Sequence, residues 1–137
     1  MKTIVTAASC GELDRVREFV DAELEACDCS FKLTYQLELV VEEVFVNIAS
    51  YAYPTEPGTA EVSVGVEGTP PTITLVFRDA GVPVDPVAQK EADTSPDALQ
   101  SRVGGLGIFL VKKTMDEVRY AYENGHNVLT LKKKLLP

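Results

Sequence analysis

The chain lacks both glycine-rich signatures that most often reveal a phosphate site, G-x-x-x-x-G-K-[ST] and G-x-G-x-x-G. No apolar run reaches the roughly eighteen residues that a membrane span needs, and the start "MKTIVTAASC" has too short an apolar segment for a signal peptide. The three cysteines form neither a disulfide framework nor a zinc pattern. We therefore expect a cytoplasmic protein with reduced thiols and no membrane association.

Basic residues are also scarce, with 13 Lys and Arg against 21 Asp and Glu and a formal net charge of −8. This balance argues against a general nucleic-acid binder, because phosphate contacts along a duplex need a basic footprint. One bound nucleotide remains compatible, since it needs only a local positive site. A length of 137 residues suits a single domain spanning residues 1–137, with a core of its own.

Hydrophobic periodicity and turn residues predict the element order β-α-α-β-β-loop-α-β-β. The predicted strands are 2–7, 60–66, 72–79, 117–123 and 128–135, and the predicted helices are 13–26, 31–51 and 106–115. Ser9 and Ser30 are the expected helix caps, and Asn124–Gly125 is a hairpin turn. The grouping predicts an α+β two-layer sandwich: a mixed, mostly antiparallel sheet with helices on one face, and not a doubly wound parallel fold.

The second predicted helix carries a polar face beside its apolar stripe. Glu43 and Asn47 are one turn apart, and Gln36 and Ser50 share their side of the helix. Such a face is most often simply solvated. The functional alternative is a carboxylate that accepts a proton, next to a carboxamide oxygen that is a hard ligand for Mg²⁺.

The stretch "FRDAGVPVDP" places Asp79 at the end of a strand with Gly81 two residues later. A carboxylate there can accept a hydrogen bond from an exocyclic amine such as that of adenine. The neighbouring glycine would let a ring approach the backbone closely. The alternative is an ordinary strand-to-loop turn, in which Asp and Gly are common.

The stretch "RVGGLGIFLV" brings three glycines to the start of a predicted helix. Flexible backbone amides at a helix N-terminus form an anion site, although close packing could equally require the glycines. The preceding residues, from about 83 to 104, are polar and proline-containing, which is typical of a functional or disordered loop.

In this order along one chain, these features resemble the GHKL ATPase superfamily with its Bergerat ATP-binding fold, and within it the small anti-sigma-factor serine/threonine kinases of bacteria. "EEVFVNIASYAYP" looks like the family's N box. "RDAGVPVDP" and "GGLGIFLVKKTMDEV" look like its two glycine boxes, and "GHNVLTLKKKL" is similar to its closing hairpin. The resemblance covers nearly the whole chain.

The resemblance implies a role for each matching position. Glu43 would be the general base of phosphotransfer, Asn47 would coordinate Mg²⁺, and Asp79 would receive the adenine amino group. Residues 83–104 would form the ATP lid. The other residues expected at the ATP site are Gly81 beside the ring, Arg102, Gly104, Gly105, Leu106 and Gly107 at the phosphates, and Thr130 near the adenine.

Three positions depart from the family pattern. Pro83 occupies the place of the second glycine in D-x-G-x-G, and Tyr51 stands where the N box often has His. Val103 matches the place of a kinase arginine, with Arg102 one residue earlier. These departures bear on hinge freedom and on how the γ-phosphate is handled.

Two functions follow from the resemblance. The first is an ATP- and Mg²⁺-dependent protein-serine/threonine kinase, a homodimer that binds a sigma factor and phosphorylates a STAS-domain antagonist. The second is a nucleotide-gated binding module with little or no turnover. The catalytic part of a two-component histidine kinase is disfavoured, because no helical hairpin bearing a phosphoacceptor precedes the domain and His126 is most simply a turn residue.

Overall fold

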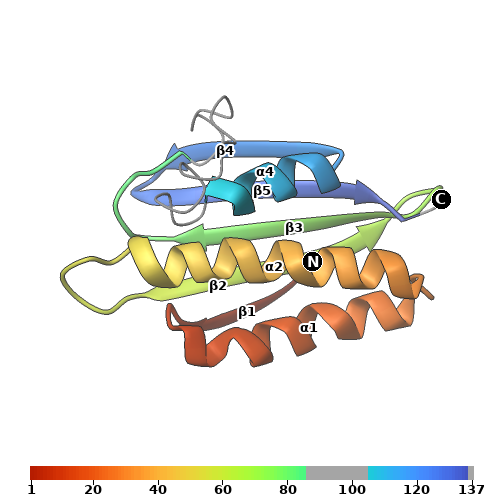
Figure 1. Ribbon diagram of the computed structural model, residues 1–137, viewed down its shortest axis with the longest axis horizontal. Coiled ribbons are helices and arrows are strands. Elements are labelled where there is room, and N and C mark those ends of the chain that lie inside the picture. Colours follow the sequence, from red (N-terminus) through yellow and green to blue (C-terminus); the bar gives the residue numbers. More distant parts are fainter. Residues whose placement is uncertain (86–104, 136–137) are drawn as a thin grey trace.

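The computed structural model describes residues 1–85 and 105–135, with side chains from Ile108 onward in the second range (Figure 1). Its elements run β1, η1, α1, α2, β2, β3, α4, β4, β5 along the chain. Their bounds are β1 Lys2–Ala7, η1 Cys10–Glu12, α1 Leu13–Ala26, α2 Phe31–Tyr51, β2 Thr59–Glu67, β3 Thr72–Asp79, α4 Gly105–Thr114, β4 Glu117–Glu123 and β5 His126–Lys134.

The strands form one five-stranded sheet in the order β1-β2-β3-β5-β4, and every described pairing is antiparallel. Helices α1, α2 and α4 cover one face of it (Figure 1). The predicted α+β two-layer sandwich is therefore confirmed. In the described part of the chain the sheet is antiparallel throughout, where the sequence predicted a mostly antiparallel one.

The core lies between the sheet and the helices. Strand β3 alternates along its whole length, so Ile73, Leu75, Phe77 and Asp79 point toward the helices while the residues between them are half-buried. Strand β5 repeats this pattern, with Asn127, Leu129 and Leu131 pointing inward. The helices fill the other side of this layer with Val16, Val20 and Leu24 of α1 and Leu37, Val40, Val41, Val44 and Phe45 of α2.

The local signals that start and stop these elements act as the sequence indicates, with small shifts. The Ser30 hydroxyl caps α2 by accepting from Leu33 N–H at 3.2 Å. Ser9 caps the short η1 helix rather than α1 itself. Asn124 and Gly125 both have positive φ, 53° and 77°, which suits a two-residue hairpin turn. Strand β5 consequently begins at His126, two residues before its predicted start.

One carboxylate pair, Asp21 and Glu38, joins α1 to α2 through a side-chain hydrogen bond. The pKa of Asp21 is raised from 3.8 to about 6, first by burial and then by Glu38 of α2, with Arg17 acting in the opposite direction. Oδ1 of Asp21 is buried without a hydrogen-bond partner in the described part of the chain. Folding thus favours the protonated acid, so the stability it contributes is fully present below the ordinary pKa of 3.8 and is lost as the pH rises from there through about 6.

We predict that Asp21→Asn, which mimics the protonated acid, raises the melting temperature by a few degrees at pH 8 and hardly at all at about pH 3.5, where the acid is largely protonated in both the folded and the unfolded state. Melting curves at both pH values test this. The matched control is Glu18→Gln, because Glu18 is an exposed acid of the same helix. An equal gain at both pH values would contradict the account.

Candidate nucleotide site

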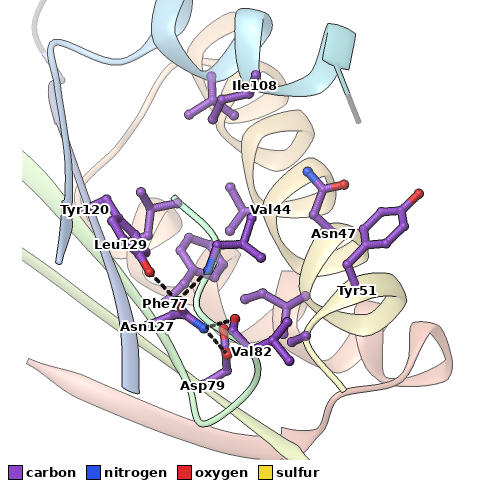
Figure 2. A pocket seen from close by; sticks show the side chains of 14 residues that line it. Val44, Asn47, Tyr51, Phe77, Asp79, Val82, Ile108, Tyr120, Asn127 and Leu129 are labelled. Atoms are coloured by element: carbon purple, nitrogen blue, oxygen red, sulfur yellow. Dashed lines mark hydrogen bonds between the residues drawn. The ribbon is translucent and has the colours of Figure 1, made fainter. Parts of the chain in front are cut away.

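A cavity of about 350 Å³ lies between the C-terminal half of α2, the ends of β3 and β5, and α4 (Figure 2). Its walls are mainly apolar, and its polar groups come from a few side chains, as in many small-molecule sites. The lining residues are Val44, Asn47, Ile48, Tyr51, Ala52, Phe77, Asp79, Val82, Val84, Ile108, Val111, Tyr120, Asn127 and Leu129. Asp79 and Asn127 lie at one end, and Ile108 of α4 lies at the other (Figure 2).

Helix α2 supplies one wall. Asn47 and Tyr51 are one turn apart and lie on the same side of the helix (Figure 2). Glu43 is one turn before Asn47, is half-buried, and is not among the lining residues. Burial raises its pKa above the ordinary value, and the neighbouring Glu42 adds to the effect. A carboxylate with a raised pKa is a stronger base, which suits a proton acceptor at the edge of a site.

Asp79 forms the polar end of the cavity and is 6% exposed. Its Oδ1 accepts two hydrogen bonds, from Gly81 N–H and from the Asn127 amide, both at 2.9 Å. Among the described residues, no hydrogen bond involves its Oδ2. One carboxylate oxygen is therefore held by the protein, and the other is available to a ligand.

Gly81 packs against the end of α2. A Cβ at this position would lie 2.2 Å from the Ala52 carbonyl oxygen, and the next residue, Val82, donates its N–H to that oxygen at 2.8 Å. Tyr53 adds a second link, because its hydroxyl accepts from Ala80 N–H at 2.8 Å and donates to the Thr59 carbonyl. The glycine is thus required by the approach of two backbone segments.

Asn127 is the site residue that the sequence interpretation missed. It is 8% exposed and pairs with Asp79 across the β3–β5 ladder. The predicted strand starts at residue 128, so the sequence places Asn127 in the preceding turn. A signal was present: extending the inward alternation of Leu131 and Leu129 by one step places residue 127 on the same face.

Thr130, which the resemblance placed near the adenine, requires a correction. It lies between the inward-facing Leu129 and Leu131, so it belongs to the opposite face of the sheet, and it does not line the cavity. Its strand neighbours are Val76 and Arg119. Strand alternation is the physical reason, because Thr130 lies three residues after the inward-facing Asn127, and an odd number of steps along a strand moves a side chain to the other face.

The glycine stretch is described in part. Gly105 is the first residue of α4 and Gly107 lies in its first turn, and Ile108 and Val111 of the same helix line the cavity. The start of α4 therefore adjoins the site, where a helix N-terminus favours an anion. Arg102, Gly104 and the side chain of Leu106 lie outside the described residues, as does most of the expected lid.

No group of three or more metal-ligating side chains occurs in the described ranges. A magnesium ion bound together with phosphates needs few protein ligands, since it keeps waters and takes phosphate oxygens. None of the described residues that line the cavity is basic. The carboxamide of Asn47 lies on the cavity wall and is a suitable hard ligand of this kind.

The fold and the cavity define an ATP-binding domain of the GHKL type. The chain belongs to the histidine kinase-like ATPase domain family, which matches residues 6–133. This confirms the family that the motifs predicted. No helix in the described ranges has the length and apolar character needed to cross a bilayer.

Curated relatives add a narrower likeness. A serine-protein kinase RsbW of Listeria monocytogenes is 28% identical over 107 residues, which cover 75% of this chain and 68% of the relative. The protein of the same name from Bacillus licheniformis is 30% identical over 97 residues, covering 67% of this chain and 60% of the relative. The names of these relatives support the interpretation of this chain as a kinase.

A solved structure shows the same fold. The histidine kinase AdeS of Acinetobacter baumannii matches with a TM-score of 0.50 and 11% sequence identity, over 100% of this chain and 70% of that one. At this identity the match concerns the fold alone.

We predict that Gly81→Ala destabilises the protein by about 2 kcal/mol or more, because the new methyl group must displace the backbone of α2. Urea unfolding measures the loss. Gly11→Ala is the control, since a Cβ there would meet only the Ser9 hydroxyl, at 3.7 Å. Equal stability of the two variants would contradict the packing role of Gly81.

Proposed function

We propose that this chain is an ATP- and Mg²⁺-dependent protein-serine/threonine kinase of the anti-sigma-factor type. It would bind a sigma factor and phosphorylate a STAS-domain antagonist, acting as a homodimer in the cytoplasm. The observation that carries the proposal is that Asp79 and Asn47 line the same cavity (Figure 2). Asp79 is the last residue of β3, and Asn47 lies on α2. The serine-protein kinase names of the relatives support the choice of acceptor.

In this proposal the base of the nucleotide enters the end of the cavity at which Asp79 and Asn127 lie. The exocyclic amine of adenine donates to Oδ2 of Asp79, the oxygen that the described residues leave available. Phe77 and Leu129 lie beside this carboxylate on adjacent strands and offer apolar surface to the ring. Gly81 contributes by letting the loop after β3 lie close to α2.

The phosphates then run toward Asn47 and the start of α4. The Asn47 carboxamide would hold Mg²⁺, which would reduce the negative charge of the phosphates. The backbone amides at Gly105 and Gly107 favour the same anion, together with Arg102 and Gly104. This arrangement meets the main need of phosphoryl transfer, which is positioning with charge stabilisation.

Glu43 would act on the protein substrate. Its half-buried carboxylate lies one turn from Asn47 at the edge of the cavity, where a hydroxyl of a docked partner can reach it. As the hydroxyl oxygen bonds to the γ-phosphorus and ADP leaves, Glu43 takes the hydroxyl proton. The raised pKa of Glu43 favours this role as base.

One observation favours a second candidate, a nucleotide-gated binding module with little turnover. The chain on both sides of Pro83 is tied down: Val82 N–H donates to the Ala52 carbonyl at 2.8 Å, and Val84 N–H donates to Asn127 Oδ1 at 3.3 Å. A fixed start would restrict the motion of the expected lid. Such a protein would bind ATP and a partner without rapid transfer.

We predict that Glu43→Gln lowers phosphate transfer at least about a hundredfold while ATP affinity changes little, because it removes the base and keeps the shape. The assay incubates the protein with γ-labelled ATP, Mg²⁺ and a STAS-domain protein encoded nearby. Glu42→Gln is the control, as a neighbouring half-buried acid of α2. Tight ATP binding without label on any partner supports the module, and undiminished transfer excludes Glu43 as the base.

We also predict that Asp79→Asn weakens ATP binding about ten- to a hundredfold, since a charge-assisted hydrogen bond contributes about 1.5–3 kcal/mol. Isothermal titration with Mg-ATP measures the change. Thr74→Val is the control, because Thr74 belongs to the same strand and the other face of the sheet. Unchanged affinity in Asp79→Asn would remove this carboxylate from the nucleotide site.

A further inference from the structure

Asn127 has every hydrogen-bonding position occupied by protein. Its Nδ2 donates to Asp79 Oδ1 and to the Val82 carbonyl, each at 2.9 Å. Its Oδ1 accepts from Val84 N–H at 3.3 Å and from the Tyr120 hydroxyl. A primary amide offers two donors and about two acceptor positions, so none remains for a ligand.

These partners also fix which way the amide faces (Figure 2). Reversing it would set the amide oxygen against the Asp79 carboxylate and the Val82 carbonyl, and its NH₂ group against Val84 N–H. Three unfavourable contacts in a buried site would replace three favourable ones. Asn127 therefore always presents a donor to Asp79.

The Asn127 donor also determines where the other oxygen of Asp79, Oδ2, lies. With Gly81 N–H and the Asn127 amide both on Oδ1, the carboxylate is held in one orientation and Oδ2 stays available at the cavity. That oxygen accepts hydrogen bonds and cannot donate. A purine with an amino group at position 6 satisfies it, whereas a carbonyl at position 6 sets two acceptors against each other.

We propose that Asn127 is a positioning residue that sets the selectivity of this site for 6-aminopurine over 6-oxopurine nucleotides, by holding the Asp79 carboxylate so that an acceptor oxygen faces the base and cannot turn away from a 6-oxo group. The proposal rests on the proposed function, since it requires that Asp79 receive the base. It adds a residue from β5 that touches no ligand and acts through its neighbour.

Titrations with Mg-ATP and Mg-ITP test the proposal, because inosine 5′-triphosphate carries oxygen in place of the 6-amino group, together with a hydrogen on N1, and is otherwise identical to ATP. The wild-type protein should bind ATP at least about tenfold more tightly than ITP. Asn127→Ser should reduce that ratio about fivefold or more, because Asp79 is then held by Gly81 alone. Thr74→Val, on the opposite face of β3, should keep the wild-type ratio.

Asp79→Asn gives a second, opposite test. With Asn127 in place, the oxygen of the new amide must face Gly81 N–H and the Asn127 amide, so its NH₂ group faces the base. The preference should then invert in favour of ITP. In the double variant Asp79→Asn with Asn127→Ser the new amide is less constrained, and the inversion should be smaller.

The outcomes distinguish a failure of the proposed adenine site from a failure of the role proposed for Asn127. A wild-type protein that binds neither nucleotide, or both equally, overturns the proposed adenine site and this inference with it. A wild-type preference for ATP that persists unchanged in Asn127→Ser, or that fails to invert in Asp79→Asn, overturns the inference alone. Melting curves without nucleotide show which variants are folded, and if Asn127→Ser is unfolded, Asp79→Asn decides because it keeps Asn127.

Discussion

The hydrogen bond from Val82 N–H to the Ala52 carbonyl, 2.8 Å long, joins the loop after β3 to the C-terminal end of α2. The cavity depends on this junction, because one of its walls is α2 and the other is the β3–β5 ladder. Gly81 permits it, since any side chain there would strike the Ala52 carbonyl. Tyr53 reinforces it from the side of the loop that leads into β2. The distance between Asp79 and Asn47 is therefore set by backbone packing.

The sequence predicted the fold well because its signals are local and redundant. Helix α2 runs for 21 residues behind the Ser30 cap and carries an apolar stripe, and Asn124–Gly125 specifies its hairpin by two positive φ angles. Strand order was harder, because β3 lies between β2 and β5, and the β3–β5 pairing joins segments 48 residues apart at Asp79 and Asn127. No local pattern encodes that pairing.

Site residues were predictable where local sequence alone places the side chain, at a strand end or on a helix face. They were less predictable where the face depends on the exact start of a strand. Asp79 at a strand end and Asn47 on a helix face were both visible in the sequence, and both line the cavity. Thr130 was assigned by resemblance and lies on the other face of the sheet. The predicted strand begins at residue 128, two residues after the observed start of β5, and this leaves Asn127 in the turn. An error of two residues at a boundary removed the side chain that holds Asp79 in place.

Helix α2 connects the end of the cavity proposed to bind adenine with the end proposed to bind the phosphates. Its C-terminal end anchors the Asp79 loop through Ala52, and its next turns carry Tyr51 and Asn47 along the cavity wall. One turn further, Glu43 is half-buried with a raised pKa. Because an α-helix rises about 5.4 Å per turn, these groups form a nearly rigid series. The loop proposed to hold the adenine and the carboxylate proposed to accept the proton in the transfer step are thus fixed relative to each other by one element. A change at the Gly81–Ala52 junction would consequently disturb both ends of the site together, whereas a change at Asn127 would act on the end proposed to receive the adenine.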